Sequence, residues 1–373
     1  MNKRQDTERG NGMIFYIGIL ALVCVYGMKI FGFREFNKDY LSRDNTTAVK
    51  GIFVVLVFMS HFLQYYKMSG PFDVLYKEIR LFLGQLVVVM FLFYSGYGIY
   101  ESIKRKGTSY VKSFPKNRVL KTLFHLDLAI LIFFIRNLIM DIEMTVPKVL
   151  LSLIGWTSIG NSNWFMFAIL VLYIIVYVAF LVFKKNKVLG IAATTALTVV
   201  YIILMKEFSG MDAYWYNTVL CLPLGMWYSC LKDKINAVMM KNDIIYLAIT
   251  AVVAAVFLLV HNNKRELPVY ILWTIMFTLL VVFGTMKVNL GNKVLYWLGN
   301  HVFSVYILQR LPMALFAKID FIAAEREYFF ILSFAATVIL AELFDRGTGA
   351  LDKLIFDRKR DLQKQISKRF KVI

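Results

Sequence analysis

The stretch Thr47–Tyr66, TAVKGIFVVLVFMSHFLQYY, decides how the chain folds. It is a helix-length apolar run that carries Lys50 near its start and a single imidazole, His61, near its end. The separation of 11 residues between Lys50 and His61 corresponds to about 16 Å of helix, roughly half of a hydrocarbon core about 30 Å thick. If Lys50 marks one membrane face, His61 lies near the middle of the bilayer, where an ionisable group is costly and indicates function. The alternative is a histidine that links neighbouring helices by a hydrogen bond.

The composition places the whole chain in a membrane. Of its 373 residues, 59% are hydrophobic, whereas soluble proteins average about 45–50% apolar residues. Long apolar runs recur from Met13 almost to the C-terminus, which predicts an all-α, polytopic bundle of transmembrane helices. The net charge of +19 would suggest nucleic acid as partner of a soluble protein. Here the basic residues cluster between apolar runs, as expected of loops that orient a membrane protein, and no nucleic-acid partner is predicted.

About eleven spans are predicted, one N-terminal helix and a core of ten, at 13–31, 48–66, 81–100, 120–140, 163–183, 188–205, 214–230, 244–260, 268–286, 298–317 and 327–344. The piece 146–156 is too short to cross and is interpreted as a re-entrant or interfacial segment on the outer face.

The basic loops orient these spans. The connection 100–121 carries seven Lys or Arg residues against Glu101 alone, so it is predicted to be cytoplasmic. Counting from it puts the N-terminus outside and the C-terminus in the cytoplasm. The predicted domains are 1–45, an N-terminal helix and linker; 46–344, the membrane domain; and 345–373, a basic cytoplasmic tail. The three cysteines lie in apolar runs without metal-ligand spacing, so neither a disulfide framework nor a metal site is predicted.

Polar residues on the cytoplasmic side of the early spans are candidates for a phosphate-binding mouth. The third span ends in FLFYSGYG, 91–98, which contains Ser95, Gly96 and Tyr97. Small residues there either break the helix and expose backbone N–H groups or let two helices pack closely. Arg118 precedes the fourth span, where its guanidinium either pairs with phosphate or serves only as a topology-setting charge.

The fourth span contains three ionisable residues. His125 and Asp127 lie near its cytoplasmic end, and Arg136 lies toward its outer end. Such residues are expensive within a membrane unless they are paired or face a cavity. Because His125 and Asp127 are two residues apart, they lie on different helix faces and form no obvious dyad.

The later spans contain further polar residues. Trp164 opens the fifth span at the outer interface, where Trp is most often an anchor. Ser304, Tyr306 and Gln309 are polar positions at increasing depth in the tenth span, and Arg310 lies deep within the same apolar run. The sequence contains no GxSxG elbow, P-loop or HExxH motif, which excludes a soluble-enzyme interpretation.

Taken in order, these pieces resemble the acyltransferase family 3 membrane proteins, which O-acylate cell-surface glycans. The resemblance covers roughly 46–343. It rests on five pieces, namely Lys50-Gly51 with His61, the Phe-rich helix ending in Ser95-Gly96-Tyr97, the basic loop ending in Arg118, Trp164-Phe165 with Tyr173, and the late helix 298–309. Lys50 stands where the family usually has Arg, which keeps the charge but loses the bidentate fork. Gln309 stands where His is common, so position 309 is not expected to act as an acid or base.

The resemblance implies an enzyme of the plasma membrane without a bound cofactor. It would use cytoplasmic acyl-CoA, commonly acetyl-CoA, to acylate a hydroxyl of an extracellular or lipid-linked glycan. His61 would act as base or acyl carrier. The implied contacts to acyl-CoA are Lys50, Ser95, Gly96, Tyr97 and Arg118, and those lining the substrate tunnel are Trp164, Tyr173, Ser304, Tyr306 and Gln309. A separate extracytoplasmic acyl-handling protein is a possible partner.

Two other function classes remain open from the residues alone. A transporter or flippase for polysaccharide or lipid-linked sugars would also place polar groups within the membrane, but it predicts inverted repeats and paired broken helices, and neither is detected. A membrane-embedded sensor is favoured only if His61 proves dispensable. The acceptor glycan and the acyl group are left open.

Overall fold

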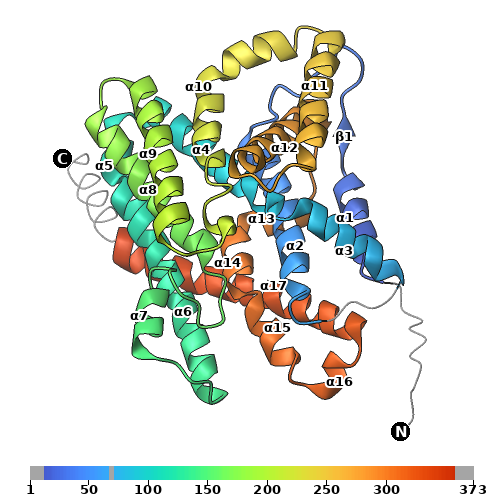
Figure 1. Ribbon diagram of the computed structural model, residues 1–373, viewed down its shortest axis with the longest axis vertical. Coiled ribbons are helices and arrows are strands. Elements are labelled where there is room, and N and C mark those ends of the chain that lie inside the picture. The colour runs from blue at the N-terminus through green and yellow to red at the C-terminus, as the bar shows by residue number, and fades with distance from the viewer. Residues whose placement is uncertain (1–11, 67–70, 358–373) are drawn as a thin grey trace, which may run out of the picture.

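The computed structural model describes residues 12–66 and 71–357 of the chain. The predictions for the extreme N-terminus, 1–11, and for the end of the basic tail, 358–373, lie outside these residues. Helix makes up 78% of the structure and there is almost no sheet, which confirms the all-α fold class (Figure 1).

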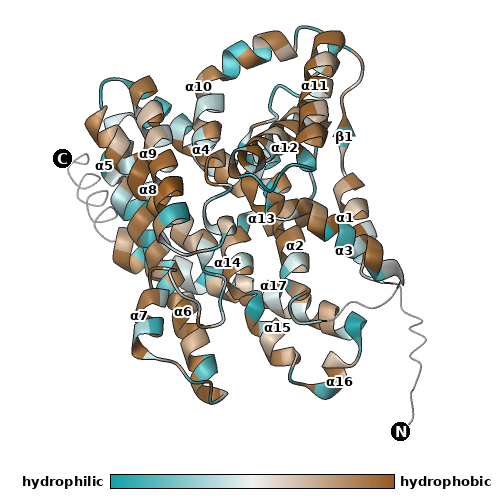
Figure 2. Ribbon diagram, viewed as in Figure 1, coloured by the Kyte–Doolittle hydropathy of each residue, from teal (hydrophilic) through white to brown (hydrophobic). Residues whose placement is uncertain are grey.

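Within the described residues, eight helical stretches are long and apolar enough to cross a membrane. They are α2 (Arg43–Phe62), α3 with α4 (Pro71–Leu83, Leu86–Lys106), α5 with α6 (Thr108–Phe114, Lys121–Ile139), α8 (Trp164–Val182), α9 (Lys187–Phe208), α11 (Asp243–His261), α12 (Leu267–Lys287) and α17 (Arg326–Asp352). Figure 2 shows hydrophobic residues along most of α6, α8, α9 and α11, as expected of surfaces that face lipid.

The remaining elements are shorter or more polar. They are α1 (Ile14–Val25), α7 (Val146–Ser152), α10 (Cys221–Met239), α13 (Lys293–Asn300), α14 (Val302–Leu308), α15 (Arg310–Phe316), α16 (Asp320–Ala323) and the strands β1 (Lys29–Ile30) and β2 (Val288–Asn289). The strands pair antiparallel, with Lys29 opposite Asn289 and Ile30 opposite Val288. The segment 146–156 contains only the seven-residue α7, in agreement with the prediction that it does not cross.

The predicted first span, 13–31, is wrong in its extent. Helix α1 ends at Val25, and its 12 residues give about 18 Å of helix, well short of a hydrocarbon core of about 30 Å. The chain turns at Gly27, whose φ of +73° favours glycine, and then pairs as β1 with β2. Apolar composition continues through this turn, so composition alone does not reveal where the helix stops.

The predicted tenth span, 298–317, is divided into α13, α14 and α15. The first break is at His301, whose Nδ1 lies 2.7 Å from the carbonyl oxygen of Trp297 and so competes with the helix hydrogen bonds. The second is at Gln309, where Pro312 has no N–H to donate to the carbonyl of Leu308. The predicted span 214–230 also differs, because α10 begins only at Cys221. The count of eleven spans is therefore not confirmed, and the orientation stays a prediction.

The last helix is longer than predicted. Helix α17 runs unbroken from Arg326 to Asp352 and continues as a π-helical turn, Lys353–Asp357. The described part of the predicted tail, from 345 onward, therefore extends the last membrane helix.

Two glycines let helices approach closely around α2 and α4. A Cβ on Gly299 of α13 would lie 1.8 Å from the carbonyl oxygen of Thr47 in α2, and a Cβ on Gly96 of α4 would lie 1.9 Å from that of Leu222 in α10. Only glycine allows such backbone contact. The first contact holds α2, which carries Lys50 and His61, against α13, and the second holds α4 against α10.

Candidate functional site

The first cluster of predicted site residues surrounds Lys50 in the N-terminal half of α2. Lys50 and Arg118 are close enough to interact electrostatically. Arg118 lies in the π-helical turn Pro115–Leu120 between α5 and α6, and its Nε donates a hydrogen bond of 3.3 Å to the hydroxyl of Tyr110. Arg118 also interacts with Tyr173, whose hydroxyl is 3.1 Å from Ser95 Oγ. The structure thus brings Lys50, Ser95, Arg118 and Tyr173 together from four separate segments.

The charge of this cluster is not neutralised by the protein. Neither Lys50 nor Arg118 forms an ion pair with a carboxylate among the described residues, and both are partly buried. A partly buried cation without an anionic partner is costly, so this arrangement suits an anionic ligand with several oxygens. We name the residues Lys50, Ser95, Arg118 and Tyr173 the basic cluster.

The other two predicted residues of this group have different roles. Helix α4 continues unbroken to Lys106, so the segment 91–98 does not break the helix or expose its N–H groups. Gly96 instead packs against the backbone of α10. Tyr97 is buried on the opposite side of α4 from Ser95, with its ring 6.0 Å from Lys232 Nζ.

The second cluster surrounds His61, which lies in the last turn of α2. Because α2 begins at Arg43 and ends at Phe62, His61 is near the end of this helix and not midway along it, whereas the sequence predicted a position near the middle of the bilayer. Its Nδ1 is buried and has no hydrogen-bond partner, and its ring centroid is 6.2 Å from that of Tyr306. The hydroxyl of Tyr306 is also buried without a partner. Buried polar atoms are nearly always satisfied in proteins, so two unsatisfied groups side by side mark a place for a ligand or water.

Aromatic rings extend this second cluster toward α8. The ring of Tyr306 contacts that of Phe165 at 5.5 Å, and Trp164 contacts Phe165 and Tyr214. Gln309 donates from Nε2 to the Tyr306 carbonyl at 2.9 Å, while its Oε1 is buried without a partner. Tyr306 therefore lies next to His61, and Gln309 and Trp164 are connected to it through Tyr306 and Phe165. Their role in a substrate tunnel stays a prediction.

Ser304 does not join them. Its Oγ donates to Asp345 of α17, and the other oxygen of Asp345 is 3.7 Å from His301 Nε2. His301 also pairs with Glu342 at 3.2 Å. On the neighbouring helix α6, His125 Nε2 is 3.0 Å from Asp352. These contacts hold α17 to α14 and α6, so Ser304, His301 and His125 have structural partners.

Sequence reasoning missed two arginines beside His61. Arg310 and Arg80 are both close enough to interact with it electrostatically. Arg310 was visible as a charge within an apolar run, but its proximity to His61 depends on a fold that joins positions 249 residues apart, 61 and 310. Arg80 precedes a span and looks like an ordinary interfacial charge in the sequence.

Lys50 and His61 lie on one face of α2, because 11 residues correspond to about three helical turns. They are about 16 Å apart along the helix. Between them on this face, Val54 and Val57 are buried, with exposed fractions of 0% and 2%. Buried apolar side chains therefore occupy the stretch of α2 between the basic cluster and His61.

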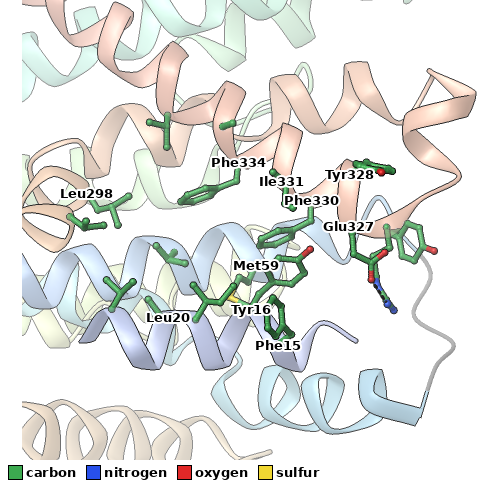
Figure 3. Close-up of a pocket in the computed structure, with 18 of the residues that line it drawn as sticks. Phe15, Tyr16, Leu20, Met59, Leu298, Glu327, Tyr328, Phe330, Ile331 and Phe334 are labelled. Atoms are coloured by element: carbon green, nitrogen blue, oxygen red, sulfur yellow. Dashed lines mark hydrogen bonds and ion pairs between the residues drawn. The ribbon is translucent and has the colours of Figure 1, made fainter. Parts of the chain in front are cut away.

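A large cavity lies on a different face of α2. It has a volume of about 1570 Å³ and opens between α1, α2, α13 and α17. Figure 3 shows Phe15 and Tyr16 of α1 opposite Phe330 and Phe334 of α17, and the rings of Tyr16 and Phe330 are 4.1 Å apart. Val55 and Met59 of α2 line the cavity, and Met59, two positions from His61, points to the other side of the helix. This apolar cavity is not part of the site around His61.

The part of the chain that the structure describes contains no group of three or more His, Cys, Asp or Glu side chains arranged to hold a metal ion. Asp127, the remaining ionisable candidate, lies on α6 with its Oδ1 buried and unpartnered.

The family comparison gives one match. The family model described as an acyltransferase domain matches residues 45–345, which covers both clusters and leaves α1 outside. No curated protein and no solved structure matches the chain.

Proposed function

The chain belongs to acyltransferase family 3 and is a membrane protein, and from this we propose that it transfers an acyl group, by default acetyl, from cytoplasmic acyl-CoA to a hydroxyl of a cell-surface or lipid-linked glycan. The observation that carries the proposal is the pairing of two unlike sites on one face of α2. The basic cluster carries uncompensated positive charge, and His61 has a free imidazole nitrogen about three helical turns away.

The basic cluster would hold the phosphates of the donor. Arg118 and Lys50 supply charge, and the hydroxyls of Ser95 and Tyr173 supply further hydrogen bonds. Charge-assisted hydrogen bonds to phosphate are roughly twice as strong as neutral ones. The thioester end of the donor would then extend along α2 toward His61. On this route it would pass the buried side chains of Val54 and Val57.

His61 would act on the acceptor. In direct transfer, the imidazole takes the proton of the hydroxyl as the oxygen attacks the thioester carbonyl; the C–S bond breaks and the thiolate leaving group receives the proton. In the covalent alternative, the imidazole nitrogen attacks the thioester carbonyl, and the C–S bond breaks to release CoA thiolate. The hydroxyl oxygen then attacks the acyl group on His61, the C–N bond breaks, and the hydroxyl proton is transferred to the thiolate. Both routes need the unpartnered nitrogen and both end in an ester and free CoA.

An experiment with purified protein in liposomes tests this function. Labelled acetyl-CoA is supplied on one side of the liposome membrane. Glycan extracted from cells that lack the protein is added as acceptor, and the label in this glycan is measured after incubation. Transfer above that of empty liposomes supports the proposal. Absence of transfer, together with protein-dependent movement of unmodified glycan across the membrane, would contradict it and favour a transporter.

The cellular counterpart uses the surface glycans themselves. Their acyl content, measured by NMR, should fall in cells lacking the protein and return when it is restored. The same comparison identifies the acyl group and the acceptor.

A further inference from the structure

Three arginines near the C-terminal end of α2 have no carboxylate partner among the described residues. They are Arg80 of α3, Arg136 of α6 and Arg310 of α15, and all are partly buried. Two other arginines do have carboxylate partners: Arg326 bonds Asp73 at 2.8 Å and Arg346 bonds Glu342 at 2.7 Å.

Two of these arginines lie near His61, and the third lies beside the same connection as one of them. Arg310 and Arg80 both interact electrostatically with His61. Arg310 Nε donates a 3.0 Å hydrogen bond to Ser162 Oγ in the connection between α7 and α8. Arg136 lies against the same connection, since a Cβ on Gly160 would lie 2.1 Å from its Nη2.

The polar atoms at this place are incompletely satisfied. Arg136 Nε is buried without a hydrogen-bond partner, as are His61 Nδ1 and the Tyr306 hydroxyl. A second link comes from Tyr65, four residues after His61, which interacts electrostatically with Arg136. An unpaired charge that is partly removed from water is costly, and so several such groups together indicate that a ligand supplies the missing partners.

Topology does not explain these charges. In the predicted orientation the C-terminal end of α2 faces outward, whereas arginines that set orientation lie on the cytoplasmic side. Membrane orientation therefore does not account for three arginines without carboxylate partners at the predicted outer end of α2.

We propose that Arg310, Arg136 and Arg80 bind a negative charge of the acceptor, so that the glycan acylated by this protein carries a phosphate or carboxylate group beside the reacting hydroxyl. The guanidinium fork matches both anions and holds them in a fixed orientation. With the anion held by Arg310, a neighbouring hydroxyl is directed to His61. This inference rests on the proposed function and adds the class of acceptor.

The first test removes the charge from the acceptor. Surface glycan from cells lacking the protein is divided into three portions: untreated, with its carboxyl groups reduced to alcohols, and with its phosphate groups removed. Each is offered with labelled acetyl-CoA to membranes that contain the protein. We expect one of the two treatments to lower transfer about 10-fold or more, and the treatment that does so identifies the anion.

The outcomes separate the two proposals. Transfer that is unaffected by either treatment overturns the anionic acceptor but leaves the acyltransferase function standing. Absence of transfer to the untreated glycan overturns both, because the inference depends on the activity.

The second test uses Arg310→Gln and Arg310→Lys, with Arg265→Gln as the matched control. Arg265 is exposed in the connection between α11 and α12, on the same predicted side of the membrane. Loss of one charge-assisted contact should raise the acceptor KM about 10- to 150-fold in Arg310→Gln, with the KM for acetyl-CoA unchanged. Arg310→Lys should recover part of the loss, and Arg265→Gln should behave as wild type.

This KM pattern distinguishes acceptor binding from other roles of Arg310. A fall in kcat with an unchanged acceptor KM would assign Arg310 to the transition state, as a donor to the oxyanion of the tetrahedral intermediate, and would overturn the proposal. An equal loss in Arg310→Lys and Arg310→Gln with reduced protein in the membrane would assign it to folding through Ser162, which also overturns it.

Discussion

His61 is the residue on which the proposed chemistry depends, and the sequence alone pointed to it. A histidine in an apolar run is visible in any sequence, and so are the charges of Lys50 and Arg118 that flank spans. The residues that lie next to them in the fold cannot be read from the sequence. Arg310 reaches His61 only because α15 packs beside α2, and Tyr173 reaches Ser95 only because α8 packs beside α4. Spacing within one helix can be read from a sequence, whereas contacts between distant helices depend on packing.

Replacing His61 separates its chemistry from its packing. His61→Gln keeps hydrogen bonding and approximate volume but does not accept a proton at neutral pH, so transfer should fall by about 10²–10⁴-fold. Binding of acetyl-CoA, measured by equilibrium dialysis, should be retained because the basic cluster lies about 16 Å away along α2. Near wild-type transfer by a stable His61→Gln protein would make His61 a structural residue, and Asp127 would be the next candidate base.

Arg118 should contribute binding energy for the donor without taking part in the chemistry. In Arg118→Ala, loss of a charge-assisted contact to phosphate should cost about 1.5–3 kcal/mol, equivalent to about 10- to 150-fold weaker acetyl-CoA binding. Lys112→Ala is the matched control, because Lys112 is an exposed cation of the same basic connection. Equal affinities of both variants and the wild type would leave Arg118 with a topological role only.

At the scale of elements, composition predicted where helices occur better than where they end. The long runs at 163–183, 188–205, 244–260 and 268–286 correspond to α8, α9, α11 and α12. Helix α1 and the broken helix α13–α15 were misjudged because a turn or break inside a membrane protein need not change its hydrophobicity. The breaks come from local hydrogen bonding at His301 and from Pro312, which remove helix contacts while the surrounding sequence stays apolar.

The contact between α2 and α13 should be intolerant of even one added methyl group. Gly299→Ala places a Cβ 1.8 Å from the Thr47 carbonyl oxygen, so one helix must shift, at a cost of about 1–3 kcal/mol. The expected result is a lower midpoint of thermal unfolding for the purified protein in detergent, with reduced transfer because α2 carries both Lys50 and His61.

Gly284→Ala is the control for this prediction. Gly284 lies within α12 and a Cβ there meets nothing within 4 Å. Because alanine is favoured over glycine in a helix by about 0.8–1 kcal/mol, this variant should unfold at the same temperature or slightly higher. Equal stability of the Gly299→Ala and Gly284→Ala proteins would show that α13 can shift away from α2 at little cost and would contradict the prediction.

At the scale of the whole molecule, orientation decides what each cluster can meet. The basic cluster can bind cytoplasmic acyl-CoA only if the start of α2 faces inward, and the three unpaired arginines can meet a surface glycan only if its end faces outward. Hydrophobicity shows that the chain enters the membrane, but it is symmetric between the two faces. The distribution of Lys and Arg between loops is what predicts direction.

Reporter fusions test that direction. A reporter joined after residue 110, within the basic connection 100–121, should be active only in the cytoplasm, and so should one joined after residue 185, between α8 and α9. A reporter after residue 264, between α11 and α12, should be active only outside. Residues 185 and 264 are separated by α9, α10 and α11, so opposite signals require that these three helices together make an odd number of crossings. Helix α10 was not among the eight long apolar stretches, and equal signals at 185 and 264 would mean that it does not cross. An external signal at 110 would reverse the start of α2 and place the basic cluster on the side without acyl-CoA, which would contradict the proposed function at its donor step.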